Sequence, residues 1–464
     1  MDEDRWTDIH TFRYTGLRFD PRTGVAEFDY LQQGSNQELA FTDVIIFPLP
    51  DKLPNAAELS AFRRALELLY VAVGTIYYKA VAPPSVSLES LALAPAAARW
   101  THQLYRRGLA EFAYRWTLPH VLELEPVIGS AAAEAEHRDL AATDRAPVVA
   151  IGGGKDSIVS LEALRAAGFA PATFAVEREI TPLLSRMMAL GGGPGLLIRR
   201  RQDPRMTELL RSNSVRIGHV PVTAINSLAG VTAAALHGLG PVVMSNERSA
   251  DEGNLVWHGH QVNHQWSKGV AAEALLSDAL SEHAGLGNAC FSLLRGMSEL
   301  SIARLFASTT GYDELVTSCN YAFRMSHQER SERWCNNCAK CRFVFLALAP
   351  FTDRARLVGI FGEDLLDDDR HLDGYRELLG LTGHKPFECV GELAESRVAA
   401  TLVAHDPAWA GSRVVGELTW EMPAPDEQST EEVLAVHPPR FAPPRYVAAL
   451  RAFIAQGCGV PARL

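Results

Sequence analysis

Between residues 148 and 157 the chain reads Val148-Val149-Ala150-Ile151-Gly152-Gly153-Gly154-Lys155-Asp156-Ser157. An apolar, strand-like run leads into three glycines. A helix then begins, with Ile158, Leu161 and Leu164 on one face and Gly168 as its stop. Glycines there let backbone N–H groups surround an anion, and the helix amino terminus adds partial positive charge. A glycine-rich turn without a ligand is the alternative. Because the triplet is followed by Lys-Asp-Ser, which suits phosphate and magnesium, the pattern predicts nucleotide binding.

Short apolar runs alternate with helical patterns from Pro147 onward. The runs are Val148–Ile151, Thr173–Val176, Leu196–Ile198 and Val242–Ser245. This alternation is typical of βαβ units, so it predicts an α/β fold with a parallel sheet. Ligands bind such sheets at the carboxyl ends of the strands, which is where the glycine loop begins.

The segment before this pattern predicts an amino-terminal α+β domain over residues 1–145, with substrate binding as its candidate role. It starts with a β-hairpin whose turn is Asp20-Pro21-Arg22-Thr23-Gly24. Helical spacing of apolar residues follows over 57–78 and 91–116. Residues 130–145 have the composition of a helical connector or a linker.

The rest of the chain divides into a central domain, residues 146–350, and a mixed carboxy-terminal region, residues 351–464. The latter carries an acidic patch at 364–369, which we interpret as solvated surface, and proline-rich loops.

Length and composition indicate a soluble globular protein of about three domains. The chain has 464 residues, 47% of them hydrophobic, and its apolar runs fall short of the ~20 residues that span a bilayer. A net charge of -11 argues against a nucleic-acid partner, because polyphosphate binding needs a positive surface. No secretory signal is visible, and seven cysteines are too few for a disulfide framework. We therefore expect a cytoplasmic protein with neither a membrane nor a nucleic acid as its partner.

Four cysteines form a candidate metal site. Cys319 precedes Cys335, Cys338 and Cys341 with the spacing C-x15-C-x2-C-x2-C. Short C-x2-C turns bring thiolates together as tetrahedral zinc requires, and an apolar helix over 343–348 would anchor them. Buried free thiols, a redox pair and an iron–sulfur cluster are the alternatives.

Two polar segments follow the strand that ends near residue 245. The loop Ser245-Asn246-Glu247-Arg248-Ser249-Ala250-Asp251-Glu252-Gly253-Asn254 would lie over the nucleotide site, although a solvated loop is the alternative. Beyond it, His260 and His264 would share a face if their segment is helical. No third metal ligand accompanies them, so we interpret them as groups that contact substrate.

The glycine loop differs from the Walker motif, because Asp156 follows Lys155 and Val149 holds the place of the distant glycine. It also lacks the third glycine of the dinucleotide motif. It resembles the PP-loop of the ATP pyrophosphatases, Ser-Gly-Gly-x-Asp-Ser, with Gly152 in place of the leading serine. This resemblance implies an adenine nucleotide alpha-hydrolase-like central domain that cleaves ATP between its α- and β-phosphates.

The cysteine module and the run Leu294–Leu300 resemble the deazaguanine nitrile synthases, which are also PP-loop enzymes. The glycine loop, the run Ser245–Ala250 and the run Trp334–Cys341 together resemble the MurL family. The resemblance is clearest over residues 147–350 and continues through Lys385-Pro386-Phe387-Glu388-Cys389.

MurL proteins are UDP-N-acetylmuramoyl-L-alanyl-L-glutamate epimerases of peptidoglycan precursor synthesis. The resemblance implies ATP- and magnesium-dependent adenylation of the α-carboxylate of the terminal L-Glu of UDP-MurNAc-L-Ala-L-Glu. Removal of the carboxylate's charge stabilises the enolate. A base then takes the Cα proton from one face, an acid returns one to the other, and water releases AMP and the D-Glu product.

The motifs and the resemblance together give the candidate site residues. ATP-binding candidates are Gly152, Gly153, Gly154, Lys155, Asp156, Ser157, Asn246, Glu247 and Arg248, with Asp156 also the candidate magnesium ligand. Catalytic candidates are Lys155, Asp156, Asp251, Glu252, His260, His264 and Lys268, with His258 and Cys319 as further acid or base groups. Candidate contacts to the UDP diphosphate or to a glutamate carboxylate are Arg199, Arg200, Arg201 and Arg205, although a basic run is more often a solvated surface.

Two other functions compete with epimerisation. The first is another PP-loop adenylating ligase, either similar to the deazaguanine nitrile synthases or amide-forming, although the net charge disfavours tRNA as its substrate. The second is a non-catalytic nucleotide sensor, against which the retained Lys155, Asp156 and Ser157 argue.

Overall fold

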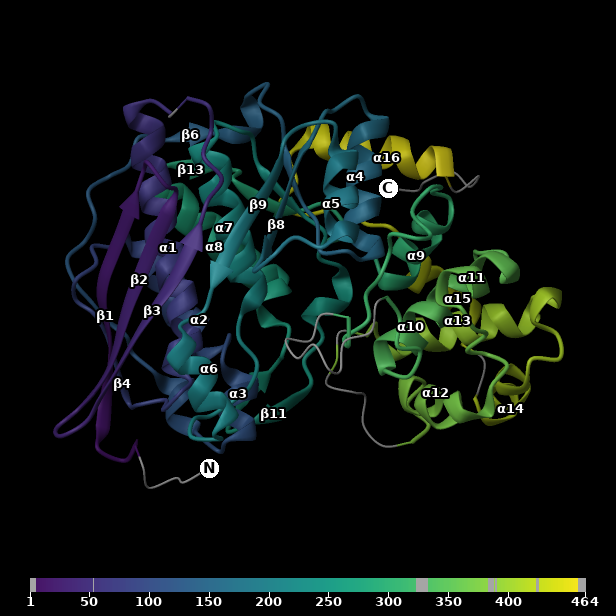
Figure 1. The fold of residues 1–464 in the computed structure, drawn as a ribbon. Coiled ribbons are helices and arrows are strands. Elements are labelled where there is room, and N and C mark those ends of the chain that lie inside the picture. Colours follow the sequence, from purple (N-terminus) through teal and green to yellow (C-terminus); the bar gives the residue numbers. More distant parts are fainter. Residues whose placement is uncertain are drawn as a thin grey trace.

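Ten strands form one sheet in the order β14-β10-β7-β8-β9-β3-β2-β1-β4-β5. Figure 1 shows part of this sheet, including β1, β2, β3, β8 and β9. The computed structural model describes residues 6–52, 54–322, 333–382, 388, 390–422 and 425–457. The strands of this sheet are β1 (Ile9–Asp20), β2 (Val25–Gly34), β3 (Glu38–Ile46), β4 (Ser85–Leu88), β5 (Val127–Ile128), β7 (Val148–Ala150), β8 (Ala172–Glu177), β9 (Gly195–Arg201), β10 (Val242–Met244) and β14 (Cys290–Ser292).

Helices cover both faces of the sheet and form most of the carboxy-terminal region. The first eight are α1 (Ala56–Tyr78), α2 (Pro95–Arg106), α3 (Ala110–Arg115), α4 (Lys155–Ala166), α5 (Pro182–Met188), α6 (Pro204–Arg211), α7 (Val222–Leu236) and α8 (Val270–Ala284). The others are α9 (Glu299–Ala307), α10 (Ala339–Leu348), α11 (Arg354–Phe361), α12 (Leu372–Leu378), α13 (Leu393–His405), α14 (Arg413–Glu421), α15 (Glu427–Leu434) and α16 (Pro444–Gly457). No described helix is long and apolar enough to cross a membrane.

The parallel part of the sheet confirms the predicted α/β class. Strands β14, β10, β7, β8 and β9 pair in parallel, and α4 and α7 lie among their crossovers. Because successive residues of a strand point to opposite faces, Val148 enters one hydrophobic core and Val149 the other. The first core contains α1, α7 and α8, and the second contains α4, α9 and the carboxy-terminal helices.

The amino-terminal hairpin is also confirmed. Strands β1 and β2 are antiparallel with Leu17 opposite Phe28, and the turn between them ends at Gly24, whose φ of 72° favours glycine. Strand β3 continues the sheet and pairs antiparallel with β9. The sheet is therefore continuous across the expected domain boundary at residue 145, a boundary that stays a prediction.

Helix α1 fixes this antiparallel part to the rest of the molecule. It begins with a capping box, in which Asn55 and Glu58 each accept a backbone N–H from the other. Its second half is buried on all sides between the sheet and α7. A Cβ on Gly74 would lie 2.2 Å from the hydroxyl of Tyr14, so the helix approaches β1 as closely as glycine permits.

The carboxy-terminal helices α10 to α15 contribute side chains to the second core, and α16 returns across the molecule to pack on α4, as Figure 1 shows. The ring of Tyr446 on α16 stacks on Phe169, with a centroid distance of 5.4 Å. The last described helix thus supports the helix that follows the glycine loop.

Two local expectations differ from the structure. Residues 130–145 form no α-helix; they contain β6 (Arg138–Asp139), which pairs with β13 (Leu286–Gly287), and one 3-10 turn. The expected helical connector is therefore wrong, and the linker interpretation stays a prediction. The segment with the histidines is a hairpin of β11 (Leu255–Trp257) and β12 (His260–Val262), so the expected helix face shared by His260 and His264 is wrong.

The reason is the turn of this hairpin. His258 and Gly259 have φ values of 49° and 77°, and two consecutive positive φ angles produce the tight turn that a two-residue hairpin needs.

A buried ion pair holds the junction between the antiparallel and parallel parts. The guanidinium of Arg200 on β9 donates to both carboxylate oxygens of Asp43 on β3, at 3.0 and 2.7 Å. The hydroxyl of Tyr77 donates to the same carboxylate at 2.7 Å, and the carboxylate is fully buried.

We predict that Asp43→Ala lowers the free energy of unfolding by about 3–5 kcal/mol, because it leaves a mostly buried guanidinium without its partner. Urea unfolding followed by circular dichroism measures this loss. The control is Glu27→Ala, which removes a partner of Arg18 on the exposed face, where such pairs contribute less than about 1 kcal/mol. Equal losses in the two variants would contradict the prediction.

Candidate active site

The glycine loop joins β7 to α4, and its backbone conformation favours glycine at position 153. Gly153 has a φ of 88°, which favours glycine. A Cβ on Gly154 would lie 2.9 Å from the hydroxyl of Ser318. The N–H of Thr317 donates to the carbonyl of Gly153 at 2.9 Å. The segment before the first cysteine of the cluster therefore supports the loop from one side.

A polar pocket of about 270 Å³ opens over this loop at the carboxyl ends of β7, β8 and β10. A Cβ on Gly152 would meet no atom within 4 Å, so the backbone is open to a ligand there. Seven predicted residues line the pocket: Gly152, Gly154, Asp156, Ser157, Asn246, Glu247 and Lys268. The structure thus brings together two sequence segments about 90 residues apart, as expected from their positions at strand ends.

Two predicted nucleotide-binding side chains point elsewhere. Arg248 extends toward the carbonyl of Glu432, with its nitrogen 3.5 Å from that oxygen. The ammonium of Lys155 is buried beneath the loop, where it donates to Asp156 and to Glu299 of α9.

Glu299 is the centre of this buried cluster. Its second oxygen accepts a hydrogen bond of 3.0 Å from Lys340, which lies between two cysteines of the cluster on α10. Burial alone would lower the pKa of Lys155, but the carboxylates of Asp156 and Glu299 outweigh it and raise that pKa. Burial alone would raise the pKa of Glu299, but the two lysines lower it. The side chains of Lys155 and Glu299 are therefore both charged at neutral pH.

The carboxylate of Asp156 lies at the boundary between this cluster and the pocket. Desolvation raises its pKa, and Lys155 opposes this shift. The negative charges of Glu299 and Glu247 raise the pKa further. Two carboxylates that line one pocket and repel each other are suited to a cation between them.

The second wall of the pocket, residues 245–247, is held by hydrogen bonds to its backbone and to Ser245. The hydroxyls of Ser160 on α4 and Ser245 are 2.7 Å apart. Arg295, which is nearly buried, donates to the carbonyl of Glu247 at 2.8 Å and pairs with Glu273 on α8 at 2.7 Å. Arg295 and Glu299 both belong to the run 294–300, which the sequence singles out without assigning either residue a role.

Several predicted proton-transfer residues lie outside the lining of this pocket. His260 is on the β11–β12 hairpin and pairs with Glu123 at 2.8 Å. Asp251 accepts the N–H of Val270 at the start of α8, at 2.7 Å. Glu252 and His258 are exposed.

His264 is buried and lies beside a histidine that the sequence analysis missed. Its Nδ1 is 2.9 Å from the side-chain oxygen of Asn254, and its ring meets that of His219 edge to face at 6.0 Å. Burial, with the charges of His264 and Lys79 adding to it, lowers the pKa of His219 to about 3. The ring of His219 is therefore neutral at pH 7. His219 belongs to no sequence motif, and only the tertiary fold brings it next to His264.

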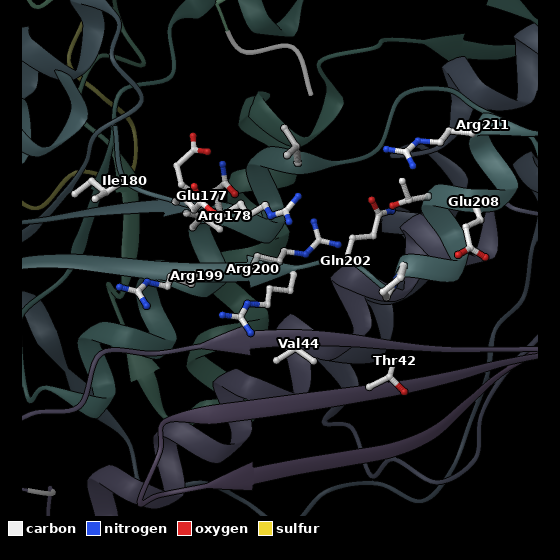
Figure 2. A pocket seen from close by; sticks show the side chains of 17 residues that line it. Thr42, Val44, Glu177, Arg178, Ile180, Arg199, Arg200, Gln202, Glu208 and Arg211 are labelled. Atoms are coloured by element: carbon white, nitrogen blue, oxygen red, sulfur yellow. The ribbon is translucent and has the colours of Figure 1, made fainter. Parts of the chain in front are cut away.

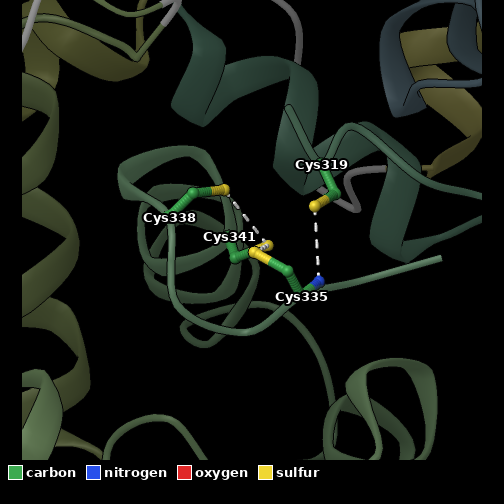
Figure 3. A group of neighbouring side chains, drawn as sticks. All are labelled: Cys319, Cys335, Cys338 and Cys341. Atoms are coloured by element: carbon green, nitrogen blue, oxygen red, sulfur yellow. Dashed lines mark hydrogen bonds between the residues drawn. The ribbon is translucent and has the colours of Figure 1, made fainter. Parts of the chain in front are cut away.

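The four cysteines of the predicted metal site come together, as Figure 3 shows. Their sulfur atoms all lie within 4.8 Å of one another. The sulfur of Cys341 is 3.8 Å from that of Cys335 and 3.5 Å from that of Cys338. Zn–S bonds of ~2.3 Å in a tetrahedron give S···S distances of about 3.8 Å, so the donor set fits zinc.

The predicted basic run divides between two environments. Arg199, Arg200 and Arg201 all line a second cavity with Arg178 and Arg211, but the guanidinium of Arg200 is bound to Asp43. Arg205 is exposed on α6, outside the lining of this cavity. Figure 2 shows the cavity beside the end of β9. The run Lys385–Cys389, apart from Glu388, lies outside the described residues, as does Cys458.

The fold and pocket define a class: an α/β protein with a mostly parallel central sheet, whose candidate site is a polar pocket on a glycine loop at the carboxyl ends of the strands. Comparison with known families narrows the class. The model of the MurL N-terminal domain matches residues 3–293, and that of the MurL C-terminal domain matches residues 315–433. The chain belongs to the MurL family.

Three relatives are each named UDP-N-acetyl-alpha-D-muramoyl-L-alanyl-L-glutamate epimerase. The protein from Micromonospora sp. is 50% identical over 452 residues, which cover 97% of this chain and 100% of that protein. The protein from Salinispora tropica is 49% identical over 453 residues, 97% of each chain. The protein from Xanthomonas oryzae pv. oryzae is 39% identical over 445 residues, 94% of this chain and 96% of its own. No solved structure matches significantly.

A buried carboxyl group on α13 connects the carboxy-terminal helices to the cluster. Glu395 accepts the N–H of Leu300 at 3.1 Å, directly after Glu299 in the chain. Burial, followed by the negative charges of Glu299 and Glu392, raises the pKa of Glu395 to about 8. Its carboxyl group is therefore mostly protonated in the folded protein at neutral pH.

We predict that this group makes the protein less stable as pH rises from about 5 to about 8. The unfolded chain loses the Glu395 proton near the ordinary value of 4.5, whereas the folded chain retains it up to about 8. Over this window Glu395→Gln, which mimics the neutral acid, should lack a loss of about 3–4 kcal/mol that the wild type shows. Urea unfolding at several pH values measures the difference. Glu431→Gln, at an exposed site on α15, is the control and should follow the wild type.

Proposed function

We propose that this chain epimerises the terminal L-Glu of UDP-MurNAc-L-Ala-L-Glu to D-Glu in peptidoglycan precursor synthesis, with ATP as co-substrate. The observation that carries the proposal is similarity along nearly the whole chain to three proteins named for this epimerisation, at 39–50% identity. ATP as a co-substrate and free cysteine thiols both favour the cytoplasm as its location.

The glycine-loop pocket has the groups that an ATP and magnesium site of the PP-loop type needs. The open backbone at Gly152 and the amino terminus of α4 suit phosphate oxygens, and the ammonium of Lys268 adds positive charge. Asp156 and Glu247 would hold magnesium, which supplies charge neutralisation on the phosphates.

The proposed chemistry begins with the α-carboxylate of the terminal glutamate. Its oxygen attacks the α-phosphorus of ATP, the bond to the β-phosphate oxygen breaks, and pyrophosphate leaves from an acyl-adenylate. The mixed anhydride has no carboxylate charge, so its Cα proton is more acidic than that of the free acid. Loss of this proton to a base, return of one from an acid on the opposite face, and hydrolysis give D-Glu and AMP.

Among the candidates for this proton transfer, Lys268 lines the pocket together with Asp156. Lys268 is close enough to His219 for its charge to lower the pKa of that histidine. We propose that Lys268 transfers the proton on one face of Cα. The buried pair His219 and His264 then forms the side of the site next to Lys268.

The decisive experiment incubates the protein with UDP-MurNAc-L-Ala-L-Glu, ATP and magnesium and then determines the configuration of the glutamate. We expect D-Glu together with AMP and pyrophosphate. AMP formed only when ammonia or tRNA is added would indicate a ligase, and the absence of turnover would indicate a nucleotide sensor. In the same assay Asp156→Ala should lower the rate at least about a hundredfold, the scale expected for loss of an electrostatic group at the reacting phosphate.

The control for this variant is Asp144→Ala, which removes an exposed carboxylate outside the pocket lining. It should retain wild-type activity. Wild-type activity in Asp156→Ala would remove the glycine loop from the proposed mechanism.

We also propose that the four-cysteine cluster holds a structural zinc ion. The sulfur distances fit a tetrahedral zinc site. The ion would connect Cys319, which follows the loop-supporting residue Thr317 by two positions, to the cysteines at the start of α10.

The purified protein should contain about one zinc per chain by elemental analysis, because four thiolates saturate a structural zinc site. Cys341→Ser should lose the metal and unfold more easily. Cys290→Ser, which alters a buried free cysteine outside the cluster, should retain it. Iron and sulfide in place of zinc would refute the assignment.

A further inference from the structure

A second cavity, of about 1260 Å³, lies directly beside the glycine-loop pocket. Val176 and Asn226 line both, so one extended ligand can occupy the two together. The walls of the second cavity come from β3, the end of β8, β9, α6 and the first turns of α7. This cavity therefore lies at the junction of the antiparallel and parallel parts of the sheet.

Arginines are the most frequent side chains of its lining. Four are exposed and form no ion pair with any residue in the described part of the chain: Arg178, Arg199, Arg201 and Arg211. The fifth, Arg200, is committed to Asp43. In Figure 2, Arg178 and Arg199 lie near the ends of β8 and β9, while Glu208 and Arg211 lie farther along the cavity on α6.

The ionisable side chains that line the cavity carry a net positive charge. Glu177, Glu179 and Glu208 also line it, so the four exposed arginines exceed the three glutamates. In a chain whose net charge is -11, this local excess of cations is against the general trend. Guanidinium groups bind phosphate oxygens through paired N–H donors, so a dianionic or trianionic phosphate group fits the cavity.

Polar side chains in the same walls suit a nucleobase. Gln202 and Asn226 carry both amide donors and carbonyl acceptors, and Thr42 and Thr207 add hydroxyls. None of the described residues that line the cavity has an aromatic ring, so base recognition would depend on these hydrogen-bonding groups.

We propose that this cavity binds the nucleoside diphosphate portion of the substrate, with the diphosphate on Arg178, Arg199 and Arg201. The glutamyl end of the same molecule then extends past Val176 and Asn226 into the glycine-loop pocket. The inference rests on the proposed function for the identity of the substrate. The presence of a site for a nucleoside diphosphate can be tested without turnover.

The test is titration calorimetry with UDP alone and the full-length protein. Wild type should bind UDP, and Arg178→Ala, Arg199→Ala and Arg201→Ala should each weaken binding about tenfold, equivalent to about 1.4 kcal/mol. Arg205→Ala is the matched control, because Arg205 belongs to the same basic run but is exposed outside the cavity. No UDP binding by the wild type, or equal UDP affinity in all four variants, would overturn the proposal.

Two further measurements separate this proposal from the proposed function. Binding of a non-hydrolysable ATP analogue should be unchanged in the three arginine variants, which also shows that they are folded. If wild type binds UDP and the variants lose it while no epimerisation occurs, the cavity assignment holds and the proposed function fails. If epimerisation occurs but the variants keep the wild-type KM for the UDP-linked substrate, the cavity assignment fails and the proposed function holds.

Discussion

The buried carboxylate of Glu299 is the interaction on which the geometry of the site depends. It binds Lys155 at the start of α4 and Lys340 at the start of α10, so it joins the helix of the glycine loop to the helix of the cysteine cluster. A buried carboxylate without cations would be very costly, and two buried lysines without carboxylates equally so. Because each charge is stable only with the others present, the three helices α4, α9 and α10 are fixed relative to one another.

The same cluster explains why the carboxy-terminal helices matter to a pocket that they do not line. Glu395 on α13 contacts the first turn of α9, and α16 packs on α4. Thr317, two residues before Cys319 begins the cluster, donates its N–H to the carbonyl of Gly153, and the side chain of Ser318 lies close to Gly154. The glycine loop is thus supported from the sheet, from α9 and from the cysteine segment, and this rigidity favours a fixed phosphate position over an adaptable one.

Local signals made part of this arrangement predictable. The strands β7, β8, β9 and β10 and the helix α4 follow from apolar runs and from the glycine triplet, because both depend on nearby residues. The meeting of the cysteines follows from their spacing. The continuous sheet does not, because the pairing of Val44 with Arg201 joins segments about 150 residues apart. Nor does the burial of the Lys155 side chain, because one of its two carboxylate partners, Glu299, lies 144 residues away in the sequence.

The charges of the molecule show how an acidic protein can accommodate anionic substrates. Its overall charge of -11 repels such ligands at long range, but screening at physiological salt limits that repulsion to about 8 Å. Closer to the two cavities, the exposed guanidinium groups of the second cavity, the ammonium of Lys268 and the backbone N–H groups of the glycine loop supply positive charge to an anionic ligand. His219, neutral through burial, adds no charge beside Lys268. Positive charge is therefore concentrated in the second cavity. In the glycine-loop pocket the carboxylates of Asp156 and Glu247 outnumber the ammonium of Lys268, so an anionic ligand there needs a cation beside it.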